Sequence, residues 1–309
     1  MNGGPITVGQ INGNYPPTSW PGPRQNLWLP YLFMRAAPGD TGARPVVGPF
    51  WESPDVYILA GVPPNLAPAV PPQLGQVALA GKDNTIYAHV WNLGRAPARE
   101  VVVEFYACDP SLGFNPTGAK LVGTAFTDLG ARGSGQSHRV VKCPESWDAT
   151  YVNGGHECLL CRVWDVAADP MTTPEWDASI NRHLGQRNIH VVPAGQQLDQ
   201  PLKFNVGPLF GMAARIDVAR AAPTNMPWLQ LHTGVRGGFP APAAPTGDVV
   251  VGAPGQVLTQ ANTTVHHDGA QVAFGSNDAP PAPGSAHVYR VTASQGGQTF
   301  GGYTVVVLG

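Results

Sequence analysis

Charged side chains are scarce in this sequence. They make up 12% of its 309 residues, against about 25% in an average soluble protein. The formal net charge is −2, no run of like charge occurs, and the few lysines are Lys82, Lys120, Lys142 and Lys203. Because nucleic-acid binding requires clustered lysine and arginine side chains, we expect no nucleic-acid partner.

Long apolar runs are missing as well. The most apolar early stretch, Leu27–Met34, has eight residues and includes Pro30, whereas a membrane-spanning helix needs about twenty. The first ten residues contain neither the basic segment nor the apolar segment of a secretory signal. We therefore expect no membrane span and no export signal, and a protein made in the cytoplasm of a host cell.

Cysteine is too rare for a disulfide-stabilised scaffold. The four cysteines are Cys108, Cys143, Cys158 and Cys161. Four cysteines allow two bridges in three different pairings, or none. The sequence therefore leaves the redox state of these thiols open.

Glycine and proline, by contrast, are abundant, with 38 and 33 residues. Both residue types interrupt helices, which disfavours helical bundles, coiled coils and doubly wound α/β folds. Collagen is excluded because no Gly-X-Y repeat occurs, and a hydrophobic content of 43% argues against disorder. The composition predicts an all-β, loop-rich protein of two domains.

Prolines interrupt residues 1–48 throughout and predict an extended Pro/Gly-rich N-terminal arm. Aromatic residues that could anchor this arm are Trp20, Trp28, Tyr31 and Phe33. Two interpretations are open: the arm packs on its own domain, or it lies on a neighbouring subunit, where a stiff chain loses little entropy. If it contacts a neighbour, deletion of residues 1–48 should weaken assembly and leave each sandwich folded.

Residues 49–193 carry a series of short strand patterns separated by turn residues. In the clearest pattern, apolar and larger residues alternate over Ile86-Tyr87-Ala88-His89-Val90-Trp91. Such alternation is typical of antiparallel β-sandwich strands. We predict two immunoglobulin-like antiparallel β-sandwich domains: the first over 49–193, a linker at 194–204, and a second, smaller sandwich over 205–309. Segments 287–293 and 303–308 predict a closing hairpin.

Four segments of the first predicted sandwich carry a resemblance to a known family. They are 51–55 (WESPD), 84–98 (NTIYAHVWNLGRAPA), 156–163 (HECLLCRV) and 186–192 (QRNIHVV). They resemble bacterial immunoglobulin-like modules of the cell-adhesion-related, CARDB-like type. The resemblance covers residues 49–193 and implies a non-catalytic spacer or adhesion module, usually outside the cell.

One group of residues has ligand types that suit zinc, namely His156, Cys158 and Cys161. Alternation along a strand would direct Cys158 and Cys161 to opposite faces of the sheet. Structural thiols are therefore favoured, with a disulfide to Cys143 or Cys108 as a further alternative.

A second group, Asp165 and Asp169, could hold calcium in a loop. Carboxylates in a loop more often cap turns, and Asp169 precedes a proline that favours a turn. We therefore predict no metal site and no cofactor.

These features favour a non-catalytic structural protein of a symmetric particle, namely a phage virion component that decorates a capsid or forms part of a tail or fibre. The alternative is a cell-surface or secreted bacterial adhesion module that binds glycan or protein. A third is an enzyme with an unrecognised site, although no catalytic residue is predicted. The expected partners are further copies, other capsid or tail proteins, or a surface glycan. Besides the aromatic residues of the arm, loop residues expected either to contact partners or to plug the sandwich ends are Trp147, Trp176 and Trp228.

Overall fold

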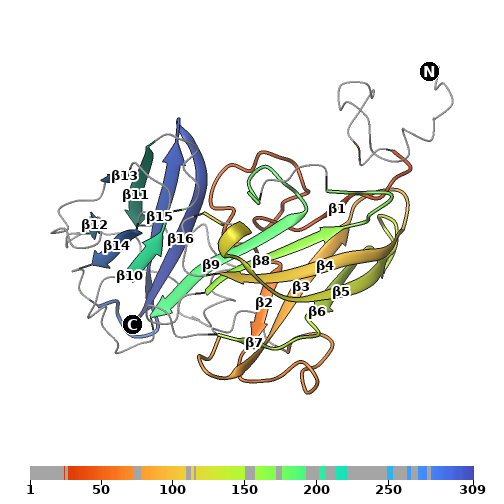
Figure 1. Ribbon diagram of the computed structural model, residues 1–309, viewed down its shortest axis with the longest axis horizontal. Coiled ribbons are helices and arrows are strands. Elements are labelled where there is room, and N and C mark those ends of the chain that lie inside the picture. Colours follow the sequence, from red (N-terminus) through yellow and green to blue (C-terminus); the bar gives the residue numbers. More distant parts are fainter. Residues whose placement is uncertain are drawn as a thin grey trace.

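Strands dominate the structure, which is a computed structural model (Figure 1). It describes residues 24, 27–72, 78–108, 113–114, 116–149, 157–171, 176–192, 202–206, 213–220, 249–252, 263–265, 271–276 and 280–309. Helical structure in these ranges is limited to short 3-10 turns such as η3 (Pro116–Gly118). The all-β sandwich fold predicted from composition and alternation is confirmed.

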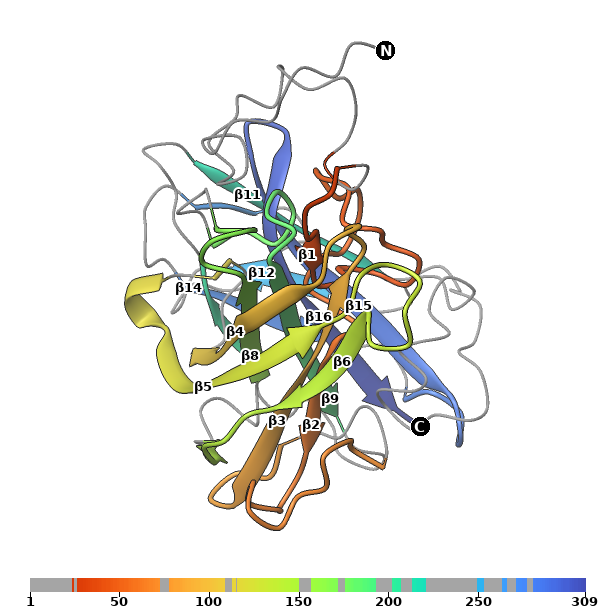
Figure 2. The same cartoon turned by 90° about the vertical axis from the view of Figure 1, so that its right-hand side faces the viewer.

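The first sandwich packs two layers of strands around an apolar core; Figure 2 views the molecule from this side. One layer contains β1 (Leu32–Phe33), β2 (Val56–Leu59), β3 (Asp83–Asn92), β6 (His138–Lys142) and β7 (Trp147–Asp148). The other contains β4 (Ala98–Cys108), β5 (Lys120–Leu129), β8 (Glu157–Trp164) and β9 (Leu184–Val192). The alternation predicted on β3 is confirmed, because the core includes Ile86, Ala88 and Val90.

The second sandwich has a smaller sheet and a share of a larger one. Its three-stranded sheet contains β10 (Leu202–Asn205), β12 (Val249–Gly252) and β14 (Gln271–Ser276). Its other strands are β11 (Ala214–Arg220), β13 (Thr263–Val265), β15 (Ala286–Gln295) and β16 (Gln298–Leu308). The closing hairpin is present as the antiparallel pair β15–β16. Gly296 and Gly297 form its turn with φ angles of 58° and 83°, which suits a tight hairpin turn that glycine accepts without strain.

The two sandwiches share one sheet. β16 pairs in parallel with β9, with Thr304 opposite Ile189 and Val307 opposite Val192. The result is an eight-stranded sheet in the order β13-β11-β15-β16-β9-β8-β4-β5, which runs through both halves of the molecule (Figure 1). Of the predicted linker 194–204, residues 202–204 belong to β10, and 194–201 lie outside the described residues. The two predicted domains are therefore parts of one β framework.

Close packing also stabilises the junction between the two sandwiches. The ring of Trp51 lies against Gly302, where an added Cβ would come within 2.4 Å of a ring carbon. The indole Nε1 of Trp51 also donates a hydrogen bond of 3.0 Å to the hydroxyl of Thr304 on β16. A segment that precedes β2 is thus fixed against a strand more than two hundred residues later.

The described part of the arm belongs to the first sandwich. β1 pairs antiparallel with β3, and Leu32 and Met34 are fully buried in the first core. Of the two interpretations of the arm, packing on its own domain therefore describes residues 27–48, whereas 1–23, 25 and 26 lie outside the described residues. The burial of Leu32 and Met34 argues against the expectation that deletion of 1–48 leaves each sandwich folded, because the deletion would remove core side chains.

Candidate functional site: aromatic contact surfaces

Two of the aromatic residues predicted to contact partners are buried instead. Tyr31 and Phe33 flank Leu32 on β1, and the Tyr31 hydroxyl donates a hydrogen bond of 2.7 Å to the carbonyl oxygen of Gly42. The guanidinium of Arg182 covers the Tyr31 ring, 4.3 Å from its centroid. The prediction that Tyr31 and Phe33 contact a partner is therefore wrong, because the chain's own fold encloses them.

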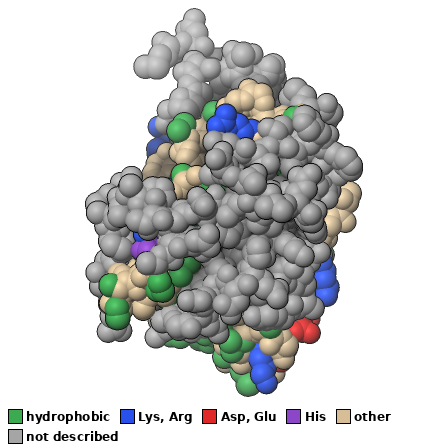
Figure 3. Space-filling view, turned by 90° about the vertical axis from the view of Figure 1, so that its left-hand side faces the viewer, with side chains coloured by type: hydrophobic (Ala, Val, Ile, Leu, Met, Phe, Trp, Pro, Cys, Tyr) green, Lys and Arg blue, Asp and Glu red, His purple; other side chains and the backbone are tan. Residues whose placement is uncertain are grey.

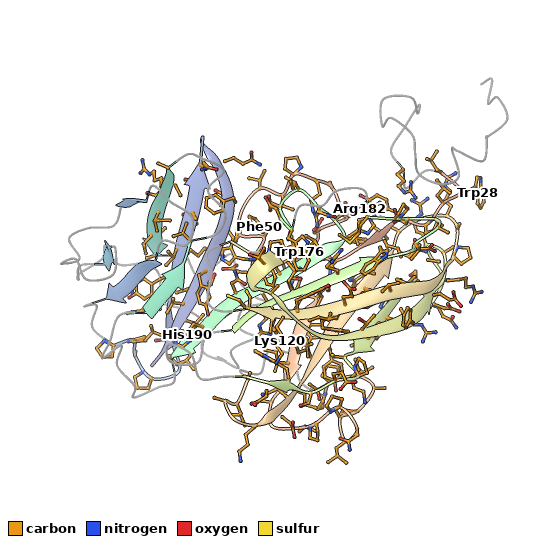
Figure 4. The ribbon with its side chains drawn as sticks, in the orientation of Figure 1. Trp28, Phe50, Lys120, Trp176, Arg182 and His190 are labelled. Carbon is orange, nitrogen blue, oxygen red and sulfur yellow. The ribbon has the colours of Figure 1, made fainter. Side chains whose placement is uncertain are left out.

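The other predicted contact residues fall into three groups. Trp20 and Trp228 lie outside the described residues. Trp147 and Trp176 are half-buried: Trp147 packs against the first core, and Trp176 packs with Phe50 in a separate cluster near the middle of the molecule (Figure 4). These two residues therefore serve at least in part as hydrophobic plugs, which was the alternative interpretation.

Among the predicted contact residues that the structure describes, Trp28 stays open to solvent. Its side chain is 74% exposed, and the guanidinium of Arg95 lies 5.9 Å from its ring centroid. Figure 4 places it at the end of the first sandwich that lies farthest from the second. A tryptophan this exposed, held beside a cation, is typical of residues that carry binding energy at interfaces.

A second aromatic surface lies on the outer face of β4, β5 and β8. Val102 has Phe126 as its register partner on one side and Trp164 on the other. Phe126 is 68% exposed, whereas Trp164 is half-buried. Alternation along each strand could have identified this row, because its members face away from the core. We call Phe126, Val102 and Trp164 the outer row.

An arginine surrounded by aromatic rings borders the outer row. The guanidinium carbon of Arg162 lies 5.8, 5.1 and 4.8 Å from the ring centroids of Tyr106, Trp164 and Trp176. Glu104 pairs with Arg162 at 3.3 Å and accepts a hydrogen bond of 2.7 Å from the Tyr106 hydroxyl. The surface therefore combines aromatic rings with one ion pair that fixes their positions.

A third cluster stacks rings on the outer face of β3. Trp91 stacks on His89 and on His138, with ring centroids 4.3 and 4.6 Å apart. The guanidinium of Arg35, from the arm, lies 4.5 Å from the Trp91 ring centroid. Asp55, fully buried, accepts hydrogen bonds from Arg35 and from the Trp91 indole, the latter at 3.0 Å. The sequence pattern placed His89 and Trp91 on one strand face but gave no sign of Arg35 or Asp55.

The titration of this cluster reflects its burial. Burial raises the pKa of Asp55 to about 6, although hydrogen bonds from Arg35 oppose the shift. Burial lowers the pKa of His89 to about 3, with smaller contributions from the guanidinium of Arg35 and from the neighbouring His138, so this histidine is neutral near pH 7. Because Asp55 is enclosed and both its oxygens accept hydrogen bonds from Arg35, its carboxylate anchors the arm.

The predicted calcium candidates have other roles. Asp165 accepts hydrogen bonds of 2.9 and 2.8 Å from the backbone amides of Ala167 and Ala168, which is a turn-capping arrangement. Asp169 is buried and pairs with Arg182 at 2.6 Å. Burial alone would raise the pKa of Asp169, but Arg182, His183 and Arg24 together outweigh it and hold the pKa below its ordinary value. These carboxylates therefore stabilise turns and the fold.

The predicted zinc candidates do not converge in the described structure. Cys158 packs in the second core and Cys161 in the first, on opposite faces of β8, as the alternation predicted. His156 lies outside the described residues. Among the residues that the structure describes, no group of three or more His, Cys, Asp or Glu side chains could hold a metal ion.

The described strands form an all-β sandwich protein. Among solved structures, the CARDB domain of a Pyrococcus furiosus protein, solved with di-metal ions, is 16% identical, with a TM-score of 0.24. That match covers 43% of this chain and 84% of the other, so the similarity concerns part of the chain.

Red sea bream transglutaminase also matches, at 14% identity and a TM-score of 0.19, over 77% of this chain. The chain spans 30% of the transglutaminase length. No protein-family model matches the chain, and no curated protein does. Within the described ranges, no helix has the length and apolar character that crossing a membrane requires.

Proposed function

We propose that this chain is a non-catalytic structural protein that acts through contacts with its neighbours in a symmetric particle, as a virion component of the capsid-decoration or tail and fibre type. The observation that carries this proposal is the exposed Trp28 at the end of the first sandwich. Tryptophan is enriched at the centres of protein interfaces and depleted from exposed surface. The prolines that precede it limit the entropy lost when such a contact forms.

The use of charge in the first sandwich supports a non-catalytic role. The buried carboxylates of Asp55 and Asp169 are each paired with an arginine, Arg35 and Arg182. A catalytic carboxylate has to reach a substrate, whereas these two hold segments of the fold together. Figure 3 views the molecule from the side of the second sandwich, and on that face the described charged side chains are few and the described hydrophobic side chains lie in small separate patches.

The shared sheet supports a role in assembly. Because β9 and β16 pair directly, the two sandwiches are held at a fixed spacing. Fixed spacing is what a closed symmetric assembly requires of its subunits. Repeated copies then gain avidity from contacts that are weak individually.

Self-association of the purified chain tests the proposal. Light scattering and negative-stain electron microscopy over a concentration series should show ordered assemblies that Trp28→Ala weakens. Leu66→Ala is the matched control, because Leu66 is also 74% exposed but lies on a different loop. A monomer at every concentration, unaffected by Trp28→Ala, would contradict a self-contact role.

The virion location is tested separately. Particles released from the source organism are banded on a density gradient, and their proteins are quantified by mass spectrometry. A virion component should band with particles at a fixed ratio to the major shell protein. Its absence from every particle band would overturn the proposed location.

A second candidate function is an adhesion module that binds glycan, and the outer row favours it. Exposed aromatic rings beside a few fixed polar groups suit the apolar faces of sugars, and Phe126 and Trp164 lie beside Glu104 and Arg162. On a glycan array, Phe126→Ala should abolish binding, and Leu66→Ala, at an exposed position on a different loop, should not. Absence of binding to any glycan would exclude this candidate.

A further inference from the structure

The four cysteines fall into two pairs that the sequence did not reveal. Cys108 on β4 is the direct register partner of Cys158 on β8 in an antiparallel ladder. Cys143 and Cys161 are buried together in the first core, close enough that Cys143 contributes to the raised pKa of Cys161. The structure contains all four as thiols.

The Cys108–Cys158 pair has the backbone geometry of a disulfide. Directly opposed residues in an antiparallel pair have Cα atoms about 4.5 or about 5.5 Å apart, depending on the hydrogen-bonding position. Disulfides span Cα separations of about 4.4–6.8 Å, so either position suits a bridge. Both side chains also lie on the same face of the sheet, because both pack against the second core.

Access to reagents differs between the two pairs. Cys108 is half-buried, whereas Cys143, Cys158 and Cys161 are buried. A small disulfide in solution therefore reaches Cys108 first. Cys158 lies next to it and is placed to react with whatever forms on Cys108, while the other pair stays enclosed in the first core.

We propose that Cys108 and Cys158 form a redox modification site, which closes to a cross-strand disulfide when the protein meets a low-molecular-weight disulfide such as oxidised glutathione. The Cys108 thiolate attacks one sulfur of oxidised glutathione and releases one glutathione thiolate. The Cys158 thiolate then attacks the Cys108 sulfur of the mixed disulfide and displaces the second glutathione. The two protein thiols lose two electrons and two protons, and oxidised glutathione gains them as two reduced glutathiones.

The bridge would tie β4 to β8 where the shared sheet passes toward the second core. It would close a loop that contains residues 109–157, and such a constraint lowers the entropy of the unfolded chain. The oxidised protein should therefore have a higher Tm than the reduced protein. Cys108→Ser should remove this difference, and Cys143→Ser, in the enclosed pair, should retain it.

Thiol counting on the folded full chain tests the site directly. The chain is incubated with oxidised glutathione, denatured, and alkylated with iodoacetamide before mass spectrometry. We expect alkylation at Cys143 and Cys161 and a linkage between Cys108 and Cys158. Because trypsin leaves Cys143, Cys158 and Cys161 in one peptide, chymotrypsin is added to cleave after Leu159 and Leu160.

Each other outcome overturns the proposal. Alkylation of all four cysteines would show that the pair does not oxidise. A persistent glutathione adduct on Cys108 would show that Cys158 cannot resolve it. A linkage between Cys143 and Cys161 in place of the proposed one would show that burial does not protect the core pair. These results come from the unmodified sequence, so they stand even if a serine variant fails to fold.

Discussion

Arg290, on the closing hairpin, donates hydrogen bonds of 2.9 and 2.8 Å to the two carboxylate oxygens of Glu52, which precedes β2. Glu52 is fully buried and also accepts a hydrogen bond from the hydroxyl of Thr304. This ion pair therefore links the start of the first sandwich to the last hairpin of the second. A paired and hydrogen-bonded charge is tolerated in the interior, whereas a lone one is costly.

Removal of one partner of this pair should destabilise the whole protein. Arg290→Met leaves the Glu52 carboxylate buried without its guanidinium, which costs about 3–5 kcal/mol of unfolding free energy, measured by urea denaturation. Arg99→Met, which breaks an exposed pair with Asp128, is the control and should change stability little. The double variant Glu52→Gln/Arg290→Met should cost less than the sum of the single variants; strict additivity would argue against a direct interaction.

Gly302→Ala should also destabilise the join. An added methyl group would meet the Trp51 ring at 2.4 Å, and overpacking of this kind costs about 1–3 kcal/mol or more. Gly135→Ala is the matched control, because no atom lies within 4 Å of its added Cβ. Equal thermal midpoints for the two variants would show that Trp51 yields without cost.

Two residues of the arm, Trp28 and Met34, should contribute very differently to the free energy of unfolding. Met34 is fully buried, so Met34→Ala should lower the unfolding free energy by about 2–5 kcal/mol. Trp28→Ala, at an exposed position, should change it by no more than about 0.5 kcal/mol. Chemical denaturation of both variants checks this contrast, and a large loss with Trp28→Ala would show that Trp28 supports the fold.

Acid should destabilise the protein partly through His183. Its pKa is lowered to about 3, chiefly by burial, and its Nδ1 lies 2.7 Å from the Val163 carbonyl oxygen. In the unfolded chain the His183 imidazole has an ordinary pKa near 6.5. Below that pH it binds a proton, whereas the buried imidazole of the folded protein stays neutral. The contribution of His183 to the free energy of unfolding is therefore fully present above about pH 6.5. It decreases as the pH falls, by up to about 1.4 kcal/mol per pH unit.

The variant His183→Asn isolates this effect, because Asp55 and His89 titrate in both proteins. Urea denaturation at pH 7, 6 and 5 gives the stability difference between wild type and variant. We expect the advantage of the wild type to shrink as the pH falls. A difference independent of pH would mean that His183 takes up no extra proton on unfolding.

Local patterns in the sequence predicted the local structure well. Period-two alternation identified the core face of β3, and the strand patterns at 287–293 and 303–308 predicted the closing hairpin. Alternation also placed Cys158 and Cys161 on opposite faces. These features depend on neighbours within one strand or turn, which a short window of sequence contains.

Features that depend on distant segments could not be predicted. The parallel pairing of β9 with β16 joins segments separated by residues 193–297, and no local period encodes it. The prolines around Tyr31 concealed a buried strand, because a two-residue strand needs β3 beside it to form. The ring of aromatics around Arg162 likewise assembles from β4, β8 and the segment that carries Trp176.

The parallel contact of β9 with β16 has a consequence for synthesis in the cell. Until the ribosome has added residues 193–297 and then β16, the stretch Ile189–Val192 of β9 lacks its β16 partner, although residues 51–53 already pair with β9 at 186–188. An unpaired strand edge is a template for association with other chains, and non-local pairing forms slowly. Nascent chains on the same mRNA can therefore pair wrongly with one another during this interval. The rate of translation from β9 to β16, and chaperone binding during that time, should govern the yield of native protein.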